Sequence, residues 1–171
     1  GEDITALGQA ARVKRGLGRT FQINTLFPNV SVVADAALAV AERKGVAWRM
    51  LQPANNYREV LDESMALLDT LGLAQDARLT VLGLPYGKQR LVEIAIALGL
   101  KPRVLLLDEP AAGVPTLESH RILEVLDSLP KDIAILIIEH DMDVVFRFAQ
   151  RITVLTQGMV LLHGEVMSKS K

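Results

Sequence analysis

The segment VLLLDEP, Val104 to Pro110, is an unbroken apolar run that ends in two adjacent carboxylates and a proline. A similar run, IAILIIEHD, occupies Ile133 to Asp141. Strands that are apolar on both faces are typical of parallel sheets covered by helices. Open α/β sheets bind ligands at the carboxyl ends of their strands, so the two runs predict a polar site at one edge of a parallel sheet.

The composition limits the class of protein. A chain of 171 residues that is 50% hydrophobic and 23% charged predicts one domain with a substantial core. The net charge of -1 gives no field that would attract nucleic acid, and the absence of cysteine excludes disulfides and thiolate metal sites. No apolar run is long enough to span a bilayer and no signal peptide opens the sequence, so we expect a soluble, cytoplasmic protein.

The first hundred residues have the hydrophobic spacing of helices. We expect helices over residues 6–15, 31–43, 56–71 and 87–98, with Thr5 as the cap of the first and Ser31 at the start of the second. Each of the last two helices should bury one apolar face. These faces are Val60, Leu61, Met65, Leu68 and Leu71 in the third helix, and Leu91, Ile94, Ala95 and Leu98 in the fourth.

Beyond residue 103 the pattern alternates between strand and helix. A helix is expected from its cap at Thr116 to Pro130, and a shorter one over residues 142–149. Residues 152–155 and 159–162 flank Gln157-Gly158 and predict a terminal hairpin. The second half therefore reads as an α/β layer, and the first half as a helical insertion or lobe.

Five short motifs follow one another along the chain: GRTFQ (18–22), LPYGKQR (84–90), VLLLDEP (104–110), AAGVP (111–115) and IIEHD (137–141). This series resembles the ATP-binding subunits of ABC transporters, and its GRTFQ and DEPAAG wording is similar to that of branched-chain amino acid importers. The resemblance implies an α/β fold, part of a P-loop NTPase (RecA-like) core with an α-helical subdomain. It divides the chain into residual core and Q-loop (1–22), helical subdomain with signature motif (23–100), and α/β core with Walker B, switch histidine and terminal hairpin (101–171).

The resemblance also implies roles for four residues. Asp108 would hold the Mg²⁺ shell and Glu109 would polarise the attacking water, because phosphoryl transfer needs neutralised charge and a positioned nucleophile. His140 would hydrogen-bond a terminal phosphate, and Gln22 would meet Mg²⁺ through water. Without the resemblance, carboxylates that face solvent, a structural histidine and a solvated glutamine remain the alternatives.

In the signature segment, Gly87 and Gln89 fit a helix N-terminus that faces the γ-phosphate of ATP held by a second nucleotide-binding subunit. Pro85 does not fit, because it has neither the hydroxyl of the usual serine nor an amide donor. Lys88 brings a positive charge that could assist a phosphate or lie in solvent. Pro115 stands where the relatives' dimer-contact loop has Asp or Asn. These departures predict impaired catalysis.

The sequence contains no phosphate-binding loop of the form G-x-x-x-x-G-K-[ST], since Gly83 precedes Gly87 by four residues rather than five. In this family the loop lies before the point at which the present sequence begins. We therefore expect a fragment or a shortened relative that is inactive alone. A parallel strand without its neighbour also predicts an open sheet edge and self-association.

Three functional hypotheses follow. In the first, the parent protein hydrolyses ATP with Mg²⁺ for a branched-chain amino acid importer. It lies at the cytoplasmic face of the bacterial inner membrane, with a second nucleotide-binding subunit and transmembrane permease subunits as partners and no nucleic acid. In the second, the chain is a non-catalytic module that docks on the permease or regulates it. The third, a genome-maintenance ATPase, lacks the heptad arms and basic surface it would need.

Overall fold

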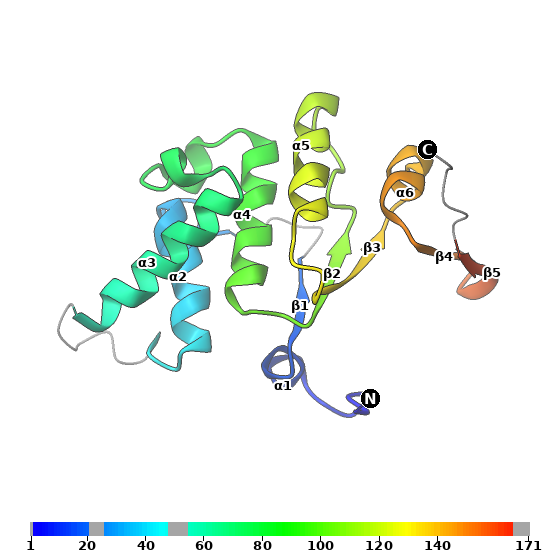
Figure 1. Ribbon diagram of the computed structural model, residues 1–171, viewed down its shortest axis with the longest axis horizontal. Coiled ribbons are helices and arrows are strands. Elements are labelled where there is room, and N and C mark those ends of the chain that lie inside the picture. Colours follow the sequence, from blue (N-terminus) through cyan, green and yellow to red (C-terminus); the bar gives the residue numbers. More distant parts are fainter. Residues whose placement is uncertain (1, 21–25, 48–54, 166–171) are drawn as a thin grey trace. The chain divides into compact units, whose positions relative to one another are not determined.

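The computed structural model describes residues 2–20, 26–47 and 55–165 (Figure 1). The chain forms two compact units, Gly1–Ile138 and Glu139–Lys171. The first unit contains α1 (Gln9–Lys14), β1 (Leu17–Arg19), α2 (Val32–Arg43), α3 (Asn55–Thr70), the 3-10 helices η2 (Ala74–Asp76) and η3 (Val81–Gly83), α4 (Tyr86–Gly99), β2 (Val104–Asp108), α5 (Thr116–Asp127) and β3 (Ala134–Ile138).

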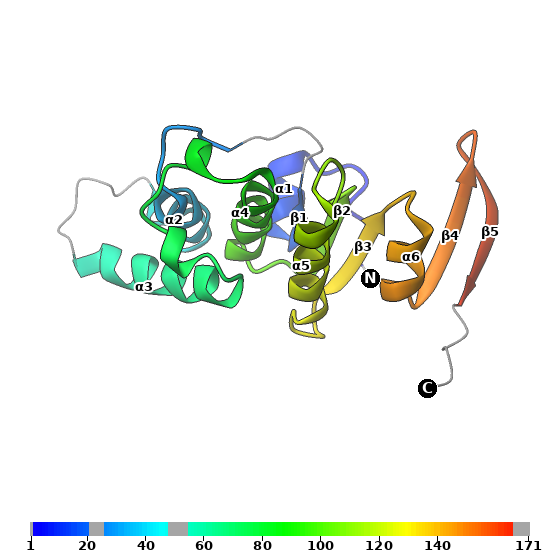
Figure 2. The same cartoon turned by 90° about the horizontal axis from the view of Figure 1, so that it is seen from above.

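The three strands of the first unit form a parallel sheet in the order β1-β2-β3 (Figure 2). Leu105 and Leu107 of β2 are fully buried, which confirms the predicted parallel α/β layer. The sequence did not single out β1, because its three residues are too few to show a period of two.

The predicted open edge is present in the part of the chain that the structure describes. There, β3 pairs with β2 alone. Leu136 and Ile138 of β3 are each 57% exposed, so the expectation that helices cover both faces of this strand is wrong for the described residues. Exposed apolar side chains beside an unpaired edge favour association. Self-association itself stays a prediction.

Helices α2, α3 and α4 pack against one another. Helix α2 starts next to Ser31 as predicted, and the Ser31 side chain caps it by accepting a hydrogen bond from the Ala34 amide. The predicted inner face of α4 is also confirmed, since its four members are at most 8% exposed: Leu91, Ile94, Ala95 and Leu98. The proposed subdomain boundaries at residues 22 and 100 stay a prediction.

The predicted face of α3 is partly wrong. Leu61 is 43% exposed and Met65 is 38% exposed, whereas Ser64 is buried. The buried stripe runs through Val60, Ser64 and Leu68, at the spacing of four residues that keeps side chains on one side of a helix. Ser64 belongs in this stripe because its hydroxyl donates to the Val60 carbonyl at 2.7 Å.

Two predicted helix caps are displaced. Helix α1 begins at Gln9 with Gly8 as its cap, and the Thr5 amide instead donates to the Asp3 carboxylate at 2.9 Å. Helix α5 has Pro115 as its cap, one residue before the predicted Thr116. Proline is suited to a helix start because its fixed φ is close to the helical value and it has no amide to leave unpaired.

The second unit contains α6 (Met142–Phe148), β4 (Arg151–Thr156) and β5 (Met159–Glu165). The two strands pair in antiparallel fashion, which confirms the predicted hairpin. Gln157 and Gly158 both have positive φ, 50° and 79°, as a two-residue type I′ turn requires. None of the described helices, in either unit, is both long and apolar enough to cross a membrane.

Candidate functional site

Two carboxylate residues, Asp108 and Glu109, lie at the carboxyl end of β2. Asp108 is its last residue, and its side chain is 23% exposed. The neighbouring strand β1 ends at Arg19, whose guanidinium lies 3.6 Å from the Asp108 carboxylate. A carboxylate is therefore present at this end of the sheet and a cation on β1 balances part of its charge, whereas the contribution of the second run, whose polar residues belong to the second unit, stays a prediction.

Glu109 adopts a left-handed backbone conformation with φ of 46°. This conformation is unfavourable for residues other than glycine and clusters at functional sites. Two hydrogen bonds hold it: the Glu109 amide donates to the Ile138 carbonyl at 2.9 Å, and its carbonyl accepts from the Ala112 amide at 3.1 Å. The chain thus leaves the sheet abruptly at the residue predicted to polarise water.

The N-terminus of α4 receives a carboxylate from α5. Pro85 is the cap of α4 and makes no side-chain cap hydrogen bond. The amide of Gly87 instead donates to the Glu118 carboxylate at 3.1 Å. A Cβ atom at Gly87 would collide with that carboxylate, the flexible end of the Glu118 side chain, so a larger residue would displace the carboxylate from the amide.

The other polar residues of the signature segment make contacts within the chain. The ammonium of Lys88 lies 2.7 Å from the Asp76 carboxylate, which neutralises the charge whose role the sequence left open. The side-chain amide of Gln89 donates to the Leu84 carbonyl at 2.9 Å and so anchors the turn before α4.

The first unit holds four of the six predicted site residues: Asp108, Glu109, Gly87 and Gln89. Gln22 lies outside the described residues. His140 belongs to the second unit, so its convergence with Asp108 stays a prediction. The sequence missed Glu118, although a carboxylate in the first turn of a helix is a recognisable signal.

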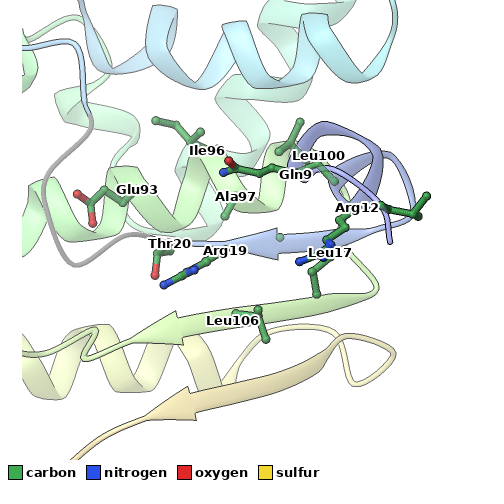
Figure 3. Close-up of a pocket in the computed structure, with 13 residues that line it drawn as sticks. Gln9, Arg12, Leu17, Arg19, Thr20, Glu93, Ile96, Ala97, Leu100 and Leu106 are labelled. Atoms are coloured by element: carbon green, nitrogen blue, oxygen red, sulfur yellow. The ribbon is translucent and has the colours of Figure 1, made fainter. Parts of the chain in front are cut away.

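A separate pocket of about 550 Å³ lies among α1, β1, β2 and α4 of the first unit (Figure 3). Most of its lining is aliphatic, and the side chain of Glu93 is 5% exposed. One Glu93 oxygen accepts a hydrogen bond from Arg90 at 2.8 Å. Burial raises the pKa of Glu93, and Arg90 opposes the shift.

Comparisons with known proteins agree with this geometry. Residues 1–112 match the family described as ABC transporter. The chain is 35% identical over 163 residues to the high-affinity branched-chain amino acid transport ATP-binding protein LivG of Escherichia coli K12, covering 91% of this chain and 63% of LivG. It is 32% identical to the corresponding protein BraF of Pseudomonas aeruginosa, covering 96% of this chain and 67% of BraF.

Solved structures give the same likeness. The chain superposes on MJ1267, an ATP-binding cassette of an ABC transporter, with a TM-score of 0.78 and 26% identity, covering 96% of this chain and 67% of that one. A nucleotide-free ATP-binding cassette gives a TM-score of 0.79 at 26% identity, with coverage of 97% and 67%. The present chain thus spans about two thirds of the proteins it resembles.

Proposed function

The chain belongs to the ABC transporter family, and from this premise we propose that it is the nucleotide-binding part of an importer that hydrolyses ATP to move branched-chain amino acids. The observation that carries the proposal is the Asp108-Glu109 pair at the carboxyl end of β2. The names of LivG and BraF support the class of transported substrate.

Asp108 would hold Mg²⁺. The chemistry of the site fits this ion, because Mg²⁺ is commonly bound by one or two carboxylates together with waters and substrate phosphates. Asp108 supplies one such carboxylate, and no group of three or more metal-binding side chains occurs among the described residues. The bound ion would neutralise negative charge on the phosphates.

Glu109 would orient and polarise the attacking water. Strand β2 ends at Asp108, and Glu109 follows it with a left-handed backbone. His140 would sense the terminal phosphate, and Gln22 would meet Mg²⁺ through water. Both assignments rest on the motif order rather than on contacts.

The proposed partners are a second nucleotide-binding subunit and a transmembrane permease, which would place the protein at the cytoplasmic face of the bacterial inner membrane. The N-terminus of α4 supports the first partner, since backbone amides at a helix N-terminus attract phosphate. The Gly87 amide already contacts Glu118, so a phosphate of the partner would have to displace that carboxylate.

The test is the exchange of Glu109 for glutamine in the intact protein. Glu109→Gln should reduce ATP turnover by at least about a hundredfold and leave ATP binding unchanged, because the amide cannot act as a base. Glu124→Gln, at an exposed position of α5, is the matched control. Unchanged hydrolysis by Glu109→Gln would remove Glu109 from this role.

A second candidate function is a non-catalytic module of the same transporter. It is favoured by Pro85, which supplies no hydroxyl cap, and by the carboxylate that occupies the Gly87 amide. Calorimetric titration of the intact protein with Mg-ATP, together with a turnover assay, separates the candidates. Saturable binding with turnover supports the ATPase, and binding or docking without turnover supports the module.

A further inference from the structure

Arg19 and Asp108 lie on neighbouring strands and on the same face of the sheet. The parallel register of β1 and β2 places Arg19 opposite Leu106, two residues before Asp108. Residues two apart on a strand point to the same face, so the Arg19 guanidinium can approach the Asp108 carboxylate. The two groups lie 3.6 Å apart. This contact follows from the register of two paired strands and does not depend on what lies beyond either end of the chain.

The Arg19 guanidinium balances the charge of Asp108. Among the residues that the structure describes, no other cationic side chain forms an ion pair with this carboxylate. The carboxylate is attached by a short side chain to the end of a paired strand, whereas the guanidinium is carried by a long side chain that is 54% exposed. Exposed ion pairs contribute little to stability, so replacement of Arg19 should leave the fold intact.

A divalent cation on Asp108 would compete with this guanidinium. Both would need the same carboxylate, and the two positive charges of the ion would be repelled by Arg19. Asp108 offers a single carboxylate, and the described residues contain no group of three or more metal-binding side chains that could offset the repulsion. Nucleotide phosphates would change this balance, because they ligate the ion and also attract a guanidinium.

We propose that Arg19 prevents Asp108 from binding a divalent cation until a nucleotide is bound. Arg19 is then a positioning residue, which acts on the metal through Asp108. Without nucleotide the guanidinium occupies the carboxylate and repels the ion, and with nucleotide the phosphates supply ligands and negative charge. The part played by phosphates rests on the proposed function. The competition between Arg19 and a cation rests on the contact at 3.6 Å alone.

Titration of the intact protein with Mn²⁺ alone, followed by the electron paramagnetic resonance of the free ion, tests the competition. Mn²⁺ shares the preference of Mg²⁺ for carboxylate and water ligands. Arg19→Gln should bind Mn²⁺ at least about tenfold more tightly than the unaltered protein, because the repelling charge is gone. The gain should be lost in Arg19→Gln/Asp108→Asn. Equal affinity of Arg19→Gln and the unaltered protein, or a gain that survives Asp108→Asn, would overturn the proposal.

Further variants separate the charge of Arg19 from a structural role. Arg19→Lys keeps the charge and should bind Mn²⁺ as weakly as the unaltered protein does. Arg58→Gln, at an exposed position of α3, removes the same charge elsewhere and should also bind as the unaltered protein does. Arg19→Met keeps an unbranched side chain and replaces Arg19→Gln if that variant does not fold. Binding by Arg19→Lys as tight as that by Arg19→Gln would contradict the role of the charge.

The same titration in saturating ATP tests the coupling to nucleotide. The phosphates should then hold the ion, so the difference between Arg19→Gln and the unaltered protein should largely disappear. A difference as large as that without nucleotide would contradict the coupling. The first titration contains no nucleotide and measures no hydrolysis. Its failure would therefore leave the proposed ATP hydrolysis standing, and absence of hydrolysis would leave the competition between Arg19 and Mn²⁺ standing.

Discussion

At position 109, a glycine variant should be at least as stable as an alanine variant. At an ordinary helical position the alanine variant is the more stable of the two. Glu109→Ala and Glu109→Gly both remove the carboxylate, so the comparison isolates the backbone. The left-handed conformation at φ 46° costs an alanine about 1 to 2 kcal/mol. Glycine avoids this cost but loses about 0.5 to 1 kcal/mol more backbone entropy on folding. The glycine variant should therefore be at least as stable as the alanine variant, and more stable by up to about 1.5 kcal/mol.

Urea denaturation followed by far-ultraviolet circular dichroism measures this difference. The reference pair is Glu124→Ala and Glu124→Gly within α5, where alanine should exceed glycine by about 1 kcal/mol. Both variants at position 109 should also lose ATP turnover in the intact protein, whichever is more stable. If the alanine variant is more stable than the glycine variant at position 109, the strained conformation is not maintained in solution and the argument for a shaped site at Glu109 fails.

Three further outcomes follow from the contacts. Hydrogen bonds from Lys101 and Lys44, together with the charge of Arg43, lower the pKa of Glu63 to about 2. The stabilisation of the fold by these contacts is therefore fully present above pH 4.5 and is lost as the pH falls toward 2. Since this side chain is 27% exposed, solvent screening reduces the effect; Glu63→Gln should cost about 1 to 2 kcal/mol at neutral pH and flatten the acid limb of a stability profile. Glu118→Ala should cost about 1 kcal/mol in urea denaturation, because it removes the acceptor of the Gly87 amide. Pro85→Ser should recover most of that loss in the double variant, because a serine hydroxyl can cap the same turn; a melting temperature no higher than that of Glu118→Ala alone would contradict this.

The sheet and α4 were predictable because their apolar patterns are long. Two unbroken runs gave β2 and β3, and the inner face of α4 follows the helical period throughout. The three residues of β1 carry no such pattern, and only pairing with β2 makes them a strand. In α3 the apolar residues cover more than one stripe, so packing against α2 and α4 selected Val60, Ser64 and Leu68 over Leu61 and Met65.

The candidate site was predictable where a motif alone determines position. Asp108 ends a strand as its apolar run requires, and Gly87 lies in the first turn of a helix that a proline caps. The contact between Gly87 and Glu118 joins residues 31 positions apart, which no local pattern encodes. The left-handed φ of Glu109 could not be predicted from the sequence either, because it depends on a hydrogen bond to the neighbouring strand at Ile138.

These contacts change the weight of each residue as evidence for function. Glycine at position 87 would be needed for a phosphate to approach the amide, yet the contact between this amide and the Glu118 carboxylate also favours glycine. Its presence therefore says little about nucleotide binding. Glutamate at position 109 is different, since its backbone conformation would be easier for glycine and nothing in its backbone hydrogen bonds requires a carboxylate. Backbone hydrogen bonds hold this conformation without specifying a carboxylate, so the identity of the Glu109 side chain carries more of the functional argument than the signature segment does.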